Sequence, residues 1–256
     1  MKLIRWGGLI TLIEREIYRF TNVVTQTIIA PVISSFLFIF IFGFALGRSI
    51  ETMAGVPYLV FIVPGLMALY LIESSYSNAS SSLFLSRWSL YIQELLVTPL
   101  SYIDLVVAII VGSLARGVVI LIGVYVVASF FETIPLEHPF LLLYFVLMIT
   151  IIFSSIGIIA ALISEKFEHL AMFSNFVITP FVYLGGVFTS LSIVPAMMGK
   201  ITKLNPFFYM VDGFRYTMLG SSDTEITINL AVITFFGIGL FTTVVWLFKI
   251  GYKIRA

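Results

Sequence analysis

The sequence predicts an all-α polytopic membrane protein, and three observations lead to this prediction. The chain of 256 residues is 60% hydrophobic and only 11% charged, which leaves too few charges to cover a water-soluble protein of this size. Six apolar runs are long enough to cross a hydrocarbon core, which takes about 20 helical residues. Because the connections are short, residues 1–256 are expected to form a single transmembrane domain.

Six transmembrane helices are expected, and they carry almost no charge. They cover residues 23–47, 56–80, 103–131, 139–163, 170–189 and 227–248. Arg116 interrupts the third run. No internal repeat, low-complexity tract or linker divides the chain.

The placement of Lys and Arg at the span ends predicts the orientation, because cytoplasmic loops carry an excess of positive charge. One side collects nine of these residues: Lys2, Arg5, Arg15, Arg19, Arg87, Lys166, Lys249, Lys253 and Arg255. The other side holds four: Arg48, Lys200, Lys203 and Arg215. Both termini are therefore expected in the cytoplasm.

Residues 7–22 are predicted to form a helix that lies in the cytoplasmic membrane interface. An apolar stripe runs along this helix, with charged residues between its members. The stripe consists of Ile10, Ile13, Ile17 and Phe20, and the charged residues are Glu14, Arg15, Glu16 and Arg19. The alternative is a poorly ordered N-terminal tail.

Residues 88–99 are predicted to contain a short amphipathic cytoplasmic helix that ends at Pro99. Its apolar side chains do not suit a solvated loop and favour a surface that another protein covers. The candidate docking residues are Leu90, Tyr91, Glu94, Leu95 and Leu96. A helix resting on lipid headgroups is an open alternative.

Residues 185–226 are predicted to form an external re-entrant hairpin before the last span. Gly and Pro cut this segment into short apolar pieces, and such irregular backbone survives at membrane depth only when protein or a wet cavity covers it. Its candidate residues are Asn205, Pro206, Asp212 and Arg215. The alternative, a seventh broken span, would place the basic C-terminus outside.

The sequence contains no recognisable nucleotide-binding, metal-binding or catalytic motif. Residues 43–49 superficially resemble a phosphate loop, but three residues instead of four separate the glycines and Arg replaces Lys, so we reject this reading. The chain has no cysteine, no HExxH and no GxSxG. His138 and His169 fall at opposite membrane faces in the predicted topology. No catalytic, cofactor-binding or metal-ligating residue is therefore assigned.

Two ionisable residues, Glu73 and Arg116, are predicted inside spans, where a charge is unfavourable unless it is paired or faces water. If the second and third spans are neighbours, the long arginine side chain could reach the carboxylate. A structural ion pair is the favoured interpretation. Direct contact with a transported substrate is the alternative.

Several short motifs occur in an order that resembles a known family. They are residues 61–65 (Phe-Ile-Val-Pro-Gly), 94–100 (Glu-Leu-Leu-Val-Thr-Pro-Leu), 115–117 (Ala-Arg-Gly), 183–188 (Tyr-Leu-Gly-Gly-Val-Phe), 204–209 (Leu-Asn-Pro-Phe-Phe-Tyr) and 213–216 (Gly-Phe-Arg-Tyr). Together they resemble the ABC-2 type membrane subunits of ATP-binding-cassette exporters, in particular bacterial permeases for drug resistance and polysaccharide export.

The resemblance implies a half-transporter in the plasma (inner) membrane of a prokaryote, surrounded by membrane lipids. Two copies would form a homodimer, and each would bind a separate cytoplasmic ATPase subunit that holds ATP and Mg²⁺. The helices at 7–22 and 88–99 would contact the ATPases, the latter as a coupling helix. Residues 86–89 (Ser-Arg-Trp-Ser) depart from the Glu-Arg that family members often carry there. Nucleic acid is not an expected partner.

The implied function is export of an amphiphilic or lipid-linked substrate. Candidate pathway residues are Tyr70, Phe181, Tyr183 and Phe188, although ordinary packing is the alternative for each aromatic side chain. Sodium extrusion by a permease of the same family and a non-transporting membrane scaffold are the alternative functions. A self-contained carrier is disfavoured, because inverted repeats and several midplane charges would be expected.

Overall fold

The computed structural model describes residues 2–43 and 52–254, and almost all of its elements are helices. In chain order the elements are α1 (Lys2–Thr21), the π-helix η1 (Thr25–Ile29), α2 (Ala30–Ile41), β1 (Thr52–Met53), β2 (Val56–Pro57), α3 (Tyr58–Trp88), α4 (Tyr91–Leu96), α5 (Tyr102–Ser129), α6 (Pro139–Ile163), α7 (Phe167–Phe173), the π-helix η3 (Ser174–Ile178), α8 (Thr179–Tyr183), α9 (Ala196–Leu204), α10 (Pro206–Leu219) and α11 (Ile226–Ile250). The two strands form a small antiparallel hairpin. Residues 44–50, which hold most of the segment that resembles a phosphate loop, lie outside the described ranges.

Among the described residues, four helices are long and apolar enough to cross a membrane: α3, α5, α6 and α11. A fifth candidate is the pair formed by Trp6–Thr21 and Thr25–Ile41, which is bent by 77°. Residues 167–183 are also helical, but their three short pieces do not meet the same length criterion. The predicted all-α membrane class is therefore confirmed, and the count of six spans stays a prediction.

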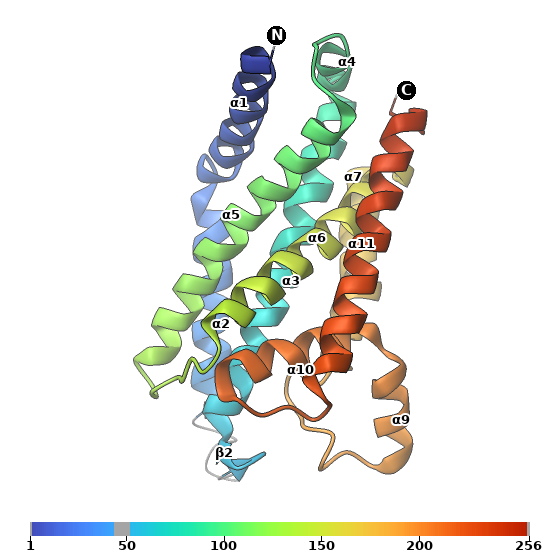
Figure 1. Cartoon of the computed structure of the whole chain (residues 1–256). Helices are drawn as coiled ribbons and strands as arrows, with labels where there is room; N and C mark the ends of the chain where they lie inside the picture. The colour runs from blue at the N-terminus through green and yellow to red at the C-terminus, as the bar shows by residue number, and fades with distance from the viewer. Residues whose placement is uncertain (1, 44–51, 255–256) are drawn as a thin grey trace.

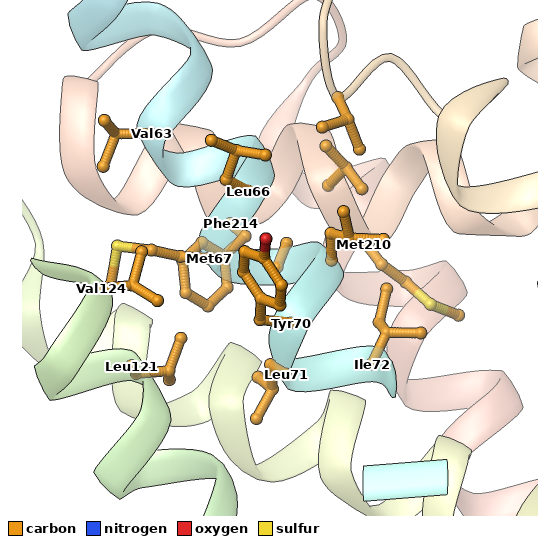
Figure 2. Close-up of a cluster of buried hydrophobic side chains, with 14 of the residues drawn as sticks. Val63, Leu66, Met67, Tyr70, Leu71, Ile72, Leu121, Val124, Met210 and Phe214 are labelled. Carbon is orange, nitrogen blue, oxygen red and sulfur yellow. The ribbon is translucent and has the colours of Figure 1, made fainter. Parts of the chain in front are cut away.

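Helix α3 is the centre of the bundle, with α5, α6 and α10 packed around it. The contact with α6 is close because of Gly157: a Cβ atom there would lie 2.6 Å from the backbone oxygen of Tyr76. Figure 2 shows the apolar cluster where α3, α5 and α10 meet, with Leu66 of α3, Val124 of α5 and Phe214 of α10. Burying each such side chain contributes roughly 1.5–3 kcal/mol to folding.

The bundle has two distinct ends (Figure 1). The start of α1, the short helix α4 and the end of α11 lie together at one end, and the β-hairpin, α9 and α10 lie at the other. The chain between α8 and α11 stays at this second end, and α10, with 14 residues, spans only about 21 Å. The re-entrant hairpin at residues 185–226 stays a prediction.

Helix α1 packs on the bundle through a different face from the predicted apolar stripe. The buried positions are Leu12, Glu16 and Phe20, which follow one another at intervals of four residues. Of the predicted stripe, Phe20 is buried, whereas Ile10 and Ile17 are exposed and free to face lipid. Glu16, one of the charged residues between the stripe positions, is also buried, because α1 turns this side chain towards α3 and α5.

Candidate functional site

The loop that carries α4 is held in a defined conformation at both of its ends. Leu90 adopts a left-handed backbone conformation with φ +60°, which reverses the chain after α3. At the other end, the hydroxyl oxygen of Ser101 accepts a hydrogen bond from the backbone N–H of Asp104 at 3.2 Å, and the Asp104 carboxylate accepts one from the backbone N–H of Ser101 at 2.9 Å. This capping box starts α5 and anchors the loop.

The structure divides the five predicted docking residues. Leu90 and Leu96 are exposed apolar side chains and Glu94 is an exposed carboxylate, whereas Tyr91 is half-buried. Leu95 is only 7% exposed and packs into the core beside Ile92. The prediction that Leu95 faces a partner is therefore wrong, because positions 92 and 95 share the inner face of this short helix.

Sequence reasoning missed two exposed apolar residues on either side of α4. Trp88 is 73% exposed and Val97 is 86% exposed. With Leu90 and Leu96 they form a set of four exposed apolar side chains, which we call the α4 rim. Trp88 and Leu90 also line a groove of about 410 Å³ between the ends of α3, α6 and α11. An apolar surface of this kind outside the spans is typical of a protein contact site.

Arg87 stands where the family often has Glu-Arg, and the structure gives it a local role. Its guanidinium donates hydrogen bonds to the backbone oxygens of Ala161 and Leu162 at the end of α6. Basic side chains near a helix C-terminus donate hydrogen bonds to the last carbonyl groups, which have no partner within the helix. Arg87 therefore fixes the end of α6 beside the groove.

A polar network connects α1 to the C-terminal half of α3. The carboxylate of Glu16 is 2% exposed, and it accepts hydrogen bonds from Ser82 at 2.8 Å and from Arg19 at 3.2 Å. Arg19 also donates to both the backbone and the side-chain oxygen of Asn78, at 2.9 and 2.8 Å. A buried carboxylate needs such partners to remain charged. Gly112 of α5 makes room for this network, because a Cβ atom there would lie 2.5 Å from the Cβ of Glu16.

A second contact extends from α1 to α4. The guanidinium of Arg15 lies 4.3 Å from the centre of the Tyr91 ring and donates a hydrogen bond to Ser86 at 3.0 Å. Cations are attracted to aromatic faces at such distances. Since Glu16, the next residue of α1, contacts Ser82 of α3, both α1 and α4 are fastened to the same stretch of α3.

The predicted pair of Glu73 and Arg116 is absent from the structure. Among the described residues, the ion pairs are Arg15–Glu16 and Arg19–Glu16, both within α1. Helix α5 contacts α3 near Leu71 and Asn78, and residue 73 lies about 200° around the helix from residue 71. Glu73 instead accepts a hydrogen bond from Thr179 of α8 at 3.4 Å. Arg116 is 9% exposed, and its Nε has no hydrogen-bond partner in the described part of the chain.

The candidate pathway residues fall into two settings. Tyr70 is 6% exposed and lies in the central apolar cluster, as Figure 2 shows. Phe188 packs between elements: its ring centre lies 5.2 Å from that of Phe42, just after α2, and 5.6 Å from that of Tyr183 of α8. Tyr183 and Phe181 are 42% and 44% exposed. An aromatic surface that includes Tyr183 and Phe188 therefore lies along α2 and α8.

The residues predicted for the external hairpin hold that segment together. Asp212 is fully buried, and its carboxylate accepts hydrogen bonds from the backbone N–H groups of Asp223 at 2.8 Å and Thr224 at 3.1 Å, and from the side chain of Asn229 at 3.1 Å. Asn205 caps α10 through the N–H of Phe207 at 3.0 Å. Pro206 occupies the first helical position, where no N–H is needed.

Arg215 connects α10 to the turn after α8. Its guanidinium donates to the backbone oxygen of Gly186 at 2.6 Å and lies 4.0 Å from the ring centre of Phe61. Gly186 has φ +84°, a conformation that side chains disfavour. The turn also rests on α3, where a Cβ atom on Gly65 would lie 2.5 Å from the backbone oxygen of Val187. These contacts close this end of the bundle.

Comparisons with known proteins agree with this architecture. The family model for the ABC-2 type transporter matches residues 8–219. The chain is similar to the inner membrane transport permease YadH of Escherichia coli strain K12, with 35% identity over 233 residues that cover 90% of each chain. It is also similar to nodulation protein J of Rhizobium meliloti strain 1021, with 22% identity over 87% of this chain and 88% of the relative.

The family match runs from α1 to the end of α10, and so includes the α4 loop and Arg215 at the closed end. With its apolar helices, the chain is a multi-pass protein of the bacterial inner membrane. The permease relative and the family match, taken with the helical bundle and the ordered α4 loop, place this chain in the ABC-2 type transporter family.

Proposed function

We propose that this chain is the membrane half of an ATP-driven exporter. Two copies form a homodimer with six spans each and with both termini in the cytoplasm. Each copy docks one cytoplasmic ATPase subunit, and the ATPase subunits bind ATP and Mg²⁺. The complex moves an amphiphilic or lipid-linked substrate outward.

The observation that carries this proposal is the α4 rim. Trp88, Leu90, Leu96 and Val97 are exposed apolar side chains on an ordered loop, at the end of the bundle where α1 begins and α11 ends. Apolar and aromatic anchors of this type dominate the energy of protein contacts. Since the permease family works with a separate ATPase, the α4 rim is the surface that we assign to it.

The contacts around α4 also suggest how movement of a docked ATPase reaches the spans. Arg15 contacts Tyr91 and Ser86, and Glu16 contacts Ser82, so that α1 and α4 are fastened to one stretch of α3. Helix α3 packs against α5, α6 and α10 over much of its length. Displacing α4 therefore displaces the central helix of the bundle.

The half-buried side of α3 is the surface that we assign to the substrate. Glu73 and Ser77 are the least covered residues in the middle of this otherwise buried helix. They lie next to α8, which presents the exposed rings of Phe181 and Tyr183. In a homodimer that joins through the first and fifth spans, the half-buried side of α3 faces the partner copy. The two copies then form a shared route for the substrate.

The docking assignment is tested by changing the α4 rim and measuring co-purification with the partner ATPase subunit. Leu96→Asp with Val97→Asp places two charges on the proposed contact surface. Loss of two such anchors costs about 2 kcal/mol or more, so recovery of the ATPase should fall at least about thirtyfold. Membrane insertion should not change, because both residues lie outside the spans.

The matched control is Leu136→Asp, which changes an apolar side chain that is 45% exposed in the loop between α5 and α6. This control should leave the complex intact. Equal recovery of the ATPase from the α4 double variant and from the unchanged protein would refute docking at α4. If no ATPase co-purifies with the unchanged protein either, the scaffold function is favoured.

A further inference from the structure

Glu73 is an acidic residue that forms no ion pair with any described residue. It is the one carboxylate that lies more than a turn from the end of a predicted span. Thr179 donates to it at 3.4 Å, and no basic nitrogen lies within 4 Å of it in the described ranges. An intramembrane carboxylate persists when it faces water or a counter-ion and commonly marks a substrate or ion pathway. Within residues 2–43 and 52–254, no such counter-ion is present.

Two tyrosines flank this carboxylate on the facing helices. Tyr70 precedes Glu73 by one turn on α3, and Tyr183 follows Thr179 by one turn on α8. Tyr70 is 6% exposed, and its hydroxyl has no hydrogen-bond partner in the described part of the chain. Figure 2 shows this hydroxyl among the carbon and sulfur atoms of the apolar cluster.

The three groups have a common chemical preference. A carboxylate attracts a positive charge directly, and the face of a tyrosine ring attracts a cation through its quadrupole. The unpartnered hydroxyl of Tyr70 offers a further oxygen lone pair. An anionic headgroup would be repelled by Glu73, and a neutral one would leave the carboxylate unbalanced. Around the site, the exposed rings of Phe181 and Tyr183 supply apolar surface.

We propose that Glu73, Tyr70 and Tyr183 form the recognition site for the cationic group of an amphiphilic substrate, an inference that rests on the exporter function proposed above. The carboxylate balances the charge of the substrate, and the ring of Tyr183 contacts the face of the cationic group. The apolar part of the substrate then lies against the aromatic surface of α8. Substrates of this class are lipophilic ammonium, phosphonium or guanidinium compounds.

The test uses two probes of the same shape and opposite charge, tetraphenylphosphonium and tetraphenylborate. Equilibrium binding of each is measured on the purified full-length protein in lipid nanodiscs, with empty nanodiscs subtracted. The unchanged protein should bind the phosphonium more tightly than the borate. Glu73→Gln should weaken phosphonium binding by roughly tenfold or more, and Glu73→Asp should retain most of it, because it keeps the charge. Tyr183→Phe should keep the affinity and Tyr183→Leu should lower it.

The matched control is Glu132→Gln, which makes the same change at an exposed position in the loop between α5 and α6. It should leave binding of both probes unchanged. The proposal is overturned if Glu73→Gln binds the phosphonium as well as the unchanged protein, or if the unchanged protein prefers the borate. Should Glu73→Gln fail to fold, Glu73→Asp and the two Tyr183 variants still decide the outcome. The assay contains no ATPase, so its result is independent of whether the docking experiment succeeds.

Discussion

Glu16 links helix α1 to the core of the bundle through its carboxylate. The side chain is buried between α1, α3 and α5, where Ser82 and Arg19 donate hydrogen bonds to it. Gly112 is needed opposite, because any larger residue would meet the Glu16 side chain. One carboxylate thereby sets the position of a helix that otherwise exposes apolar residues on its outer side.

Replacing Glu16 by Ala should destabilise the protein by about 3 kcal/mol, because Arg19 and Ser82 lose the acceptor they share and Arg19 keeps an uncompensated charge. This loss is at the low end of the range for breaking a buried ion pair, because the side chain of Arg19 is 24% exposed. Thermal unfolding in detergent measures the change. The control Glu14→Ala, at an exposed position on the same helix, should change the stability by less than about 0.5 kcal/mol. Equal shifts for the two variants would contradict the assigned role.

The separation of Glu73 from Arg116 leads to a second prediction, in the form of a double-mutant cycle. Glu73→Gln and Arg116→Met should have additive effects on the free energy of unfolding, within about 0.5 kcal/mol, because the two residues lie on different sides of α3. The positive control is the cycle of Glu16→Gln and Arg19→Met, whose members are in contact, and which should show coupling of about 1 kcal/mol or more. Strong coupling between Glu73 and Arg116 would show that the two charges do meet.

At the scale of the elements, the crossing of α3 and α6 organises the bundle. Gly157 brings the two helices so close that its own Cα faces the backbone of Tyr76 and Ser80. Small polar residues continue along α3, where Ser74, Ser75 and Asn78 are buried. Small side chains let membrane helices approach closely, which increases their van der Waals contact.

Gly157→Ala should therefore destabilise the bundle by about 1–3 kcal/mol, because the added methyl group would lie 2.6 Å from a backbone oxygen that cannot move freely. Gly239→Ala is the matched control in α11, where a Cβ atom would meet nothing within 4 Å. There the change should be neutral or stabilising by up to about 1 kcal/mol, because Ala favours helix over Gly. Thermal unfolding of the two variants in the same detergent compares them. A Gly157→Ala protein as stable as the unchanged one would contradict close packing at this crossing.

Much of this fold could be predicted from hydropathy, because an apolar run of bilayer length admits few structures other than a helix. The fourth predicted span, 139–163, coincides with α6, whereas α3 continues to Trp88, beyond the predicted end at residue 80. The polar run after Glu73 remains helical because α1, α5 and α6 cover it. Hydropathy does not report such burial, since serine and asparagine are polar in any scale.

The candidate sites could be predicted only in part, because they depend on which face of each helix is turned inward. Leu95 and Val97 are both apolar in sequence, but the first is buried and the second is 86% exposed. Glu73 and Arg116 were expected to pair from their positions along two neighbouring helices, and the rotation of α3 separates them. A signal for Glu16 was present in its spacing of four residues from Leu12 and Phe20, which are buried on the same stripe.

At the scale of the whole molecule, the bundle looks like one half of a larger assembly. Only 17% of the most apolar 18-residue stretch of α11 is buried, as expected for a helix at the lipid boundary. Helices α2 and α8 present exposed aromatic residues, among them Phe36, Phe181 and Tyr183. We assign the side of α2 and α8 to the contact with a second copy, because it carries the unbalanced carboxylate of Glu73 next to these rings.

Native mass spectrometry of the complex with the ATPase, released from nanodiscs, tests the central claim most directly. The account predicts a particle with two copies of this 256-residue chain and two copies of the ATPase subunit, and predicts that the Leu96→Asp, Val97→Asp variant yields the permease dimer alone. A single copy of the chain bound to one ATPase, or a permease that never carries an ATPase, would contradict it.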